Sequence, residues 1–215
     1  MISMKKNKEE TLRNALESPN PSTRLRAALA VGSDPHLDLS EVLVARYAEE
    51  PDFYVREMLT WALIQRPSNA LLNELKTQLR NPLPQARAQT LHIFSKLAGF
   101  APLEIWNLIS EDELHSPDID VAMAAWRAAV AVAPQDQYPQ LVRSLITQLD
   151  RAEPAAHKAL ARAFLSLGQE ATAALEELSS PLARAMLLTM DSMDSGDQEN
   201  ISVAQRVRNA GRFVE

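Results

Sequence analysis

The residues best suited to bind another molecule fall on one recurring face of several helical segments. Positions one, four, five and eight after a repeated basic position point away from the expected core at 100° per residue, where a surface helix would normally be charged. Here that face is largely apolar, and it carries two of the three tryptophans. This pattern predicts a groove in which Trp and Arg anchor a partner segment. The candidate groove residues are Glu57, Trp61, Leu91, His92, Met123, Trp126, Arg127 and Arg162. The alternative interpretation is that tight curvature or a terminal helix simply buries them.

A second set of side chains recurs at the edge between the core face and the groove face. It comprises Arg26, Arg56 and Arg87. In a stacked repeat, such a residue is expected to pair with an acid or a carbonyl of the adjoining repeat. Exposed ion pairs contribute less than ~1 kcal/mol each, so this structural ladder would fix the register of the repeats more than their stability.

The densest group of acids spans residues 111–120, with five carboxylates and His115. Carboxylate oxygens could collect a hard cation, but the stretch lacks the Asx spacing and the glycine of a calcium loop. We therefore interpret it as a solvated connection whose acids favour the start of the following helix. The four histidines show no metal-ligand spacing, and no phosphate-binding or nucleophile-elbow motif occurs. We expect no metal, no cofactor and no catalytic residue.

Composition limits the class of protein. The 215 residues include no cysteine, which excludes disulfides and thiolate chemistry, and no apolar run could span a membrane. Residues 1–107 carry 13 basic and 12 acidic side chains, and residues 108–215 carry 9 and 16. A duplex-binding protein needs a basic stripe, which the second half argues against. We expect a cytoplasmic protein whose partner is a protein or peptide segment, with no nucleic acid or membrane. The oligomeric state is not predicted.

Prolines indicate how these residues are positioned. Six of them are expected to open similar helices, namely Pro21, Pro51, Pro82, Pro117, Pro154 and Pro181. The basic position follows each of them, at Arg26, Arg56, Arg87, Ala122 (without its base), Lys158 and Arg184. This spacing is in the range of solenoid repeats. Amphipathic segments such as 40–48, 69–79 and 138–149 lie between them, and Gly32, Gly99 and Gly168 are expected to end second helices in a left-handed conformation.

The sequence therefore predicts an all-α, right-handed α-α superhelix of about six antiparallel helix pairs. We expect the solenoid over residues 1–192. Residues 193–215 are expected to form a polar tail, after a linker at 191–200 and with a short terminal helix at about 201–214.

The Asx/Glu-Pro opening, the apolar-Arg pair and the small apolar helix that follows resemble HEAT repeats of the short bacterial type. The resemblance covers about residues 10–192 and is strongest at 20–32, 50–66 and 81–98. It implies a concave face that generally binds a protein, so we expect a non-catalytic interaction scaffold or adaptor.

A second function from a different class is compatible with the same resemblance. DNA alkyl-base glycosylases of the HEAT-like class place tryptophans, an arginine and a carboxylate in the concave groove, and Trp61, Trp126, Arg127 and Glu57 could supply them. However, no carboxylate follows either tryptophan by one turn, and the groove is more apolar than basic. Nothing marks the tetrapyrrole site of a HEAT-like bilin lyase.

Overall fold

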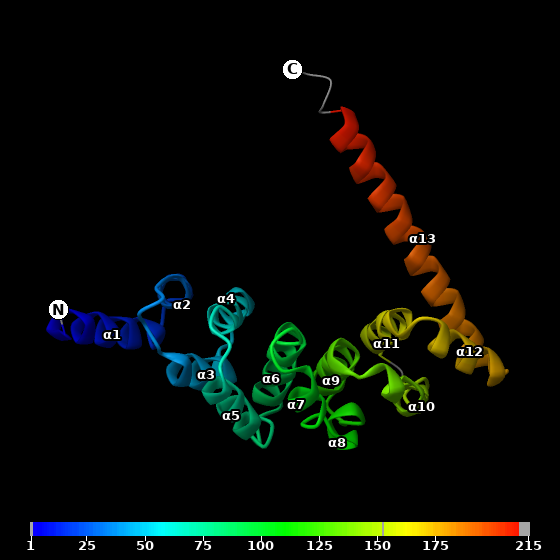
Figure 1. Ribbon diagram of the computed structural model, residues 1–215, viewed down its shortest axis with the longest axis horizontal. Coiled ribbons are helices and arrows are strands. Elements are labelled where there is room, and N and C mark those ends of the chain that lie inside the picture. Colours follow the sequence, from blue (N-terminus) through cyan, green and yellow to red (C-terminus); the bar gives the residue numbers. More distant parts are fainter. Residues whose placement is uncertain (1, 152, 211–215) are drawn as a thin grey trace. The chain divides into compact units, whose positions relative to one another are not determined.

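The chain is helical throughout the part that the structure describes. The structure is a computed structural model that describes residues 2–151 and 153–210, and the side chains of residues 6–151 and 153–195. Within these ranges it contains α-helices α1 to α13, one short 3-10 helix and no strand (Figure 1). The predicted all-α solenoid fold is confirmed.

The chain divides into two compact units, Met1–Val132 and Ala133–Glu215. In the first unit, the helices alternate as the first and second members of four repeats, with two short helices sharing the first place in the fourth repeat. They are α1 (Ile2–Leu16), α2 (Pro21–Ser33), α3 (Ser40–Glu49), α4 (Phe53–Ile64), α5 (Asn69–Gln78), α6 (Pro84–Lys96), α7 (Pro102–Trp106), α8 (Glu111–Leu114) and α9 (Ile119–Val132).

The second unit holds two further helix pairs. Its elements are η1 (Gln135–Gln137), α10 (Tyr138–Ile146), α11 (Pro154–Leu167), α12 (Gln169–Glu177) and α13 (Pro181–Ala210). The predicted boundary between a solenoid at residues 1–192 and a tail at residues 193–215 stays a prediction. However, α13 crosses it as one helix, so the stretch at 191–200 is helical and not the expected linker. Residues 211–215 lie outside the described residues.

Each second helix is preceded by a residue at the N-cap position, which gives the repeats a common register. Asn20 Oδ1 accepts a bond of 2.9 Å from Ser22 N, Asp52 Oδ1 accepts one of 3.1 Å from Val55 N, and Asp118 Oδ1 accepts one of 3.1 Å from Val121 N. The six N-cap residues are Asn20, Asp52, Leu83, Asp118, Glu153 and Ser180.

Not all six prolines open helices as predicted. Pro21, Pro154 and Pro181 are the first residues of α2, α11 and α13, whereas Pro51, Pro82 and Pro117 precede the N-cap residue of their helix.

The N-cap register shows which residues are equivalent. The fourth residue after the N-cap is Arg24, Arg56, Arg87, Ala122, His157 or Arg184. The basic positions predicted at Arg26 and Lys158 were therefore wrong, by two residues and by one. The eighth residue after the N-cap is buried in the first five repeats, as Ala28, Thr60, Leu91, Trp126 and Ala161.

Neighbouring second helices pack side by side in the first unit, with α4 against α2 and α9 against α6. Polar side-chain bonds join α6 to α4 and to α3. Gln89 Nε2 on α6 donates to Thr60 Oγ1 on α4 over 2.6 Å, so the eighth residue after an N-cap faces the following repeat. The hydroxyls of Tyr47 and Thr90 are 2.7 Å apart in the core.

Two glycines have structural roles, and only one of them is the predicted role. Gly168 ends α11 with φ 67° and ψ −138°, in a region that favours glycine. Gly32 instead lies inside α2, where a Cβ would be 2.4 Å from Cζ3 of Trp61. Gly99 has no positive φ, so the predicted left-handed helix end is wrong for Gly32 and Gly99.

Candidate functional site

Two of the recurring arginines, Arg24 and Arg56, are held by bonds within the repeat stack. Arg24 Nε and Nη2 donate to the two carboxylate oxygens of Glu50, each over 2.6 Å, and its Nη1 donates to the carbonyls of Ser18 and Pro19. Arg26, the residue predicted for this role, is exposed. The correction follows from the N-cap at Asn20, which places Arg24 and not Arg26 in the equivalent position.

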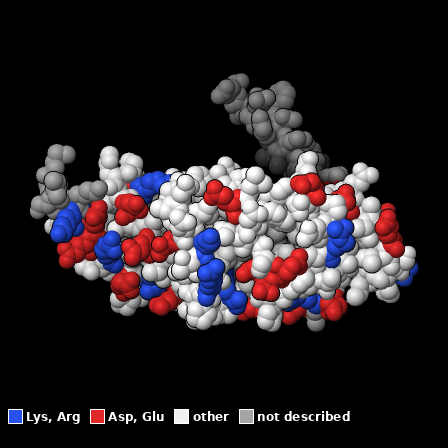
Figure 2. Space-filling view, turned by 60° about the horizontal axis from the view of Figure 1, so that its bottom comes forward, with Lys and Arg blue, Asp and Glu red and all other residues white. Residues whose placement is uncertain are grey.

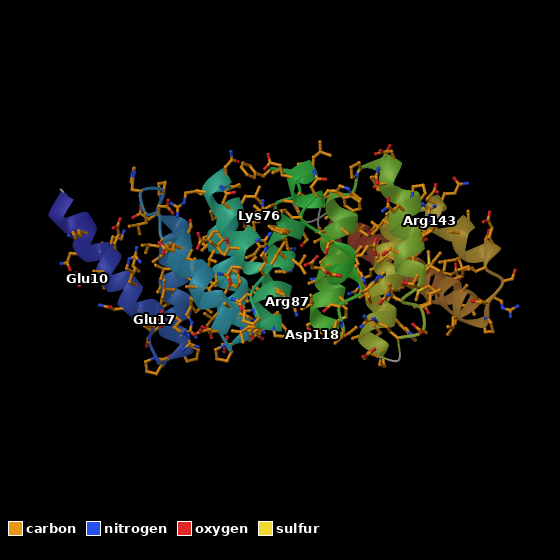
Figure 3. The ribbon with its side chains drawn as sticks, turned by 90° about the horizontal axis from the view of Figure 1, so that it is seen from below. Glu10, Glu17, Lys76, Arg87, Asp118 and Arg143 are labelled. Atoms are coloured by element: carbon orange, nitrogen blue, oxygen red, sulfur yellow. The ribbon has the colours of Figure 1, made fainter. Side chains whose placement is uncertain are left out.

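Arg56 and Arg87 occupy the same position on α4 and α6. Arg56 Nη1 donates to the carbonyls of Glu50 and Pro51, both over 2.9 Å, within its own repeat and not across to the next one. Arg87 lies in the first turn of α6, and Figure 3 shows it on the same edge of the view as Asp118, which precedes the neighbouring α9. Its Nε atom is buried and makes no hydrogen bond.

Glu50 is a junction for these bonds. Burial by itself would raise the pKa of its carboxyl, but bonds from Arg24, the Asp52 N–H and Arg46 outweigh burial and hold the pKa below its ordinary value. The carboxylate therefore stays ionised inside the protein, and we assign this cluster a structural role.

The groove side of the second helices contains a cleft of about 370 Å³ in the first unit. The helices α4, α6 and α9 form its walls, each with side chains from its first two or three turns. The lining residues are Phe53, Arg56, Glu57, Pro84, Gln85, Ala88, Gln89, His92, Asp118, Asp120, Met123, Ala124 and Arg127. We call this site the α4–α6–α9 cleft.

Three charged or titratable residues form a row across the cleft, one from each helix. His92 Nδ1 lies 3.3 Å from Arg127 Nη1, and His92 Nε2 lies 3.4 Å from Glu57 Oε1. A guanidinium can only donate, so Nδ1 accepts and the proton of the neutral imidazole sits on Nε2. Burial lowers the pKa of His92, Arg127 and Lys96 lower it further, and Glu57 opposes them, so the ring is neutral at pH 7.

Phe53, which lines the cleft, forms an aromatic pair with Tyr54. The rings of Phe53 and Tyr54 meet edge to face with centroids 5.6 Å apart, and the Arg56 guanidinium lies 5.9 Å from the Phe53 centroid. Both aromatic side chains are exposed, Phe53 by 58% and Tyr54 by 72%. Exposed aromatic surface beside an arginine is typical of binding surfaces.

The structure brings together four of the eight predicted groove residues. Glu57, His92, Met123 and Arg127 line the cleft, and their role in binding stays a prediction. Arg162 is exposed on α11, in the second unit. Trp61 is half-buried against Gly32.

The predicted exposure of Leu91 and Trp126 on the groove is wrong. Both are completely buried, and Trp126 Nε1 donates to the carbonyl of Leu114 over 2.8 Å. They are the eighth residues after their N-caps, a position that is buried in each of the first five repeats. Of the two interpretations of the apolar face, burial therefore holds for this position, while the α4–α6–α9 cleft remains open beside it.

Several cleft residues were not predicted from sequence. Phe53 and Pro84 stand in the first turn of their helices, before the positions that the repeat pattern covered. Asp118 and Asp120 belong to the acidic stretch interpreted as a connection. That interpretation describes part of their role, because Asp118 caps α9 and Ser110 forms a capping box with Glu113 at α8. A search for exposed aromatics beside helix starts would have found Phe53.

Charges of both signs are present around this site. The α4–α6–α9 cleft combines Arg56 and Arg127 with Glu57, Asp118 and Asp120. Figure 2 shows acidic and basic side chains interspersed over the described residues of one face. No helix among the described residues is long and apolar enough to cross a membrane.

Comparison with known proteins agrees with the geometry of the stack. Residues 9–92 match a family model described as HEAT repeats. Together with the stacked helix pairs, this match supports a HEAT-like repeat protein, a class that commonly mediates protein interactions. No curated protein matches the chain.

Proposed function

We propose that this protein is a non-catalytic interaction scaffold that holds a peptide segment of a partner protein in the α4–α6–α9 cleft. The observation that carries the proposal is the composition of the cleft, in which accessible aromatic, apolar and charged side chains from three successive repeats converge. A one-dimensional stack presents such a surface without a catalytic pocket. A cytoplasmic location is part of the same proposal.

The chemistry of the cleft defines the kind of segment that fits it. Phe53, Pro84 and Met123 offer apolar surface, whereas Arg127 and the acids at 118 and 120 offer opposite charges along one wall. A segment with an apolar anchor between an acidic and a basic residue would satisfy all of these groups. Anchors of this kind supply most of the binding energy in protein interfaces.

The alternative function, a DNA-binding enzyme of the alkyl-base glycosylase class, has less support. The indole of Trp126 lies in the core and not in the groove. The cleft also carries three carboxylates beside its two arginines, which is unfavourable for a surface that must neutralise phosphates.

A peptide-display library that covers the proteome of the source cell tests the proposal. Peptides selected on the wild type should bind Ala88→Arg at least about tenfold more weakly, because the new side chain fills the cleft. Ala45→Arg is the matched control, since Ala45 is exposed on α3. Equal binding to Ala88→Arg and wild type would contradict the proposal. Steep salt-dependent binding of duplex DNA would favour the enzyme class instead.

A further inference from the structure

In the sixth repeat, one side-chain position that is buried in the earlier repeats is exposed. The eighth residue after the N-cap is buried in five repeats, and the bond from Gln89 to Thr60 shows that this position faces the next second helix. In the sixth repeat the equivalent residue is Leu188 on α13. Its side chain is 72% exposed, because no further repeat follows in the described chain.

Leu188 is part of a larger apolar end face. Leu182 on α13 and Leu178 just after α12 are also exposed, by 46% and 44%, and the exposed Ala185 lies between Leu182 and Leu188. On the opposite side of α13, Ala183, Met186 and Met190 are buried within the second unit. The exposed outer face of a repeat is normally polar, which keeps the stack soluble, whereas this face carries exposed leucines.

The charges beside Leu188 indicate what covers it. Arg184 stands one turn before Leu188 and Asp191 about one turn after it, so all three share one exposed stripe of α13. A second α13 running antiparallel across Leu188 would bring Arg184 opposite the partner's Asp191. By symmetry, Asp191 would meet the partner's Arg184, so the face is complementary to itself.

We propose that this end face, Leu178 to Asp191, is a homodimer interface in which the α13 helices of two copies cross antiparallel at Leu188. When a two-fold axis relates two antiparallel helices, each edge of one helix lies against the same edge of the other. Arg184 and Asp191 lie on one edge of α13, so that edge carries both Arg–Asp pairs. On the opposite edge, the exposed Leu182 and Ala185 extend the apolar surface around α13. The crossing does not involve the α4–α6–α9 cleft, so the dimer and the proposed function stand independently.

The test is the oligomeric state of the full chain, measured by light scattering and sedimentation over a protein concentration series up to several hundred micromolar. The wild type should approach twice the chain mass of 23.8 kDa. Leu188→Glu should weaken the dimer at least about tenfold, because it places two carboxylates at the crossing point. Leu103→Glu, at a leucine on α7 that is 62% exposed, should not change the dimer.

A charge exchange distinguishes this arrangement from other ways of associating. Arg184→Asp alone and Asp191→Arg alone should each weaken the dimer, since each places like charges opposite one another. The double variant Arg184→Asp with Asp191→Arg should restore it. Both residues are exposed, so circular dichroism should show an unchanged fold. A monomeric wild type, or a dimer that ignores both single charge reversals, would overturn the proposal.

Discussion

Arg24 and Glu50 lie 26 residues apart in sequence, and two bonds of 2.6 Å join the guanidinium to the carboxylate in the interior of the first unit. The Arg24 side chain is 6% exposed and that of Glu50 is not exposed at all. A pair of this kind brings the first and second repeats into register. Breaking a buried pair leaves an uncompensated charge, which costs far more than the loss of a surface pair.

Arg24→Ala should therefore lower the free energy of unfolding by about 3–5 kcal/mol. Arg26→Ala is the control, since Arg26 is exposed on the same helix and its loss should change stability by less than about 0.5 kcal/mol. Urea denaturation followed by circular dichroism measures both. Equal effects of the two substitutions would contradict the register given by the N-caps.

The same pair makes stability depend on pH in acid. Because the folded state holds the pKa of Glu50 below its ordinary value of about 4.3, the contribution is complete above that value and is lost as the pH falls through the folded pKa. Glu50→Gln should be less stable than the wild type at neutral pH, and the difference should shrink below about pH 4. Denaturation at a series of pH values shows whether the two curves converge in acid. If the free energies of unfolding of the two proteins differed by the same amount at every pH, Glu50 would be excluded as the source of the pH dependence.

The contact between Gly32 and Trp61 predicts a cost of overpacking. Gly32→Ala should destabilise the protein by about 1–3 kcal/mol, partly offset by a helix-propensity gain of about 1 kcal/mol. In a Trp61→Leu background the substitution should cost less, because the indole carbon 2.4 Å from the new Cβ is gone. Gly99→Ala should be nearly neutral, since a Cβ there meets nothing within 4 Å. A double-mutant cycle, measured by urea denaturation, gives the coupling free energy between positions 32 and 61.

Trp126 should behave as a core residue. Trp126→Phe removes the donor to the Leu114 carbonyl and leaves a void, so it should destabilise the protein by about 1–3 kcal/mol. Trp61→Phe should cost less than about 1.5 kcal/mol. Iodide should quench the fluorescence of Trp61 more than that of Trp126 in variants that retain one tryptophan each. Efficient quenching of Trp126 would show that the indole is not enclosed.

The repeat pattern predicted the helix pairs well because it depends on local chemistry. Proline is excluded from helix interiors, so the six repeated prolines lie at the first residue of a second helix or just before its N-cap. The register within the first repeat was harder to predict. Pro21 is the first residue of α2, whereas Pro51 and Pro82 precede the N-cap residues of α4 and α6, so counting from the prolines misaligns the first repeat by two residues. An error of two residues moved the predicted ladder from Arg24 to Arg26.

The site could be predicted only in part, because a helical wheel does not contain the neighbouring helix. Thr60 and Trp61 are adjacent in sequence and both fall on the predicted groove face, yet Thr60 is buried and bonded to α6, while Trp61 is only half-buried. The burial of Trp126 depends in the same way on tertiary contacts that no single segment encodes. The cleft acids and Phe53 were missed because they come from helix starts and not from the periodic face.

The hydrogen bonds of Glu50 also affect how cooperatively the first repeats unfold. Its carboxylate accepts from Arg24 on α2 and Arg46 on α3, and its carbonyl accepts from Arg56 on α4 and Gln85 on α6. Three successive repeats thus share a single residue, whereas in a simple linear array each repeat is linked only to its neighbours. The first three repeats should therefore open together in native-state hydrogen exchange, as one block with a common free energy.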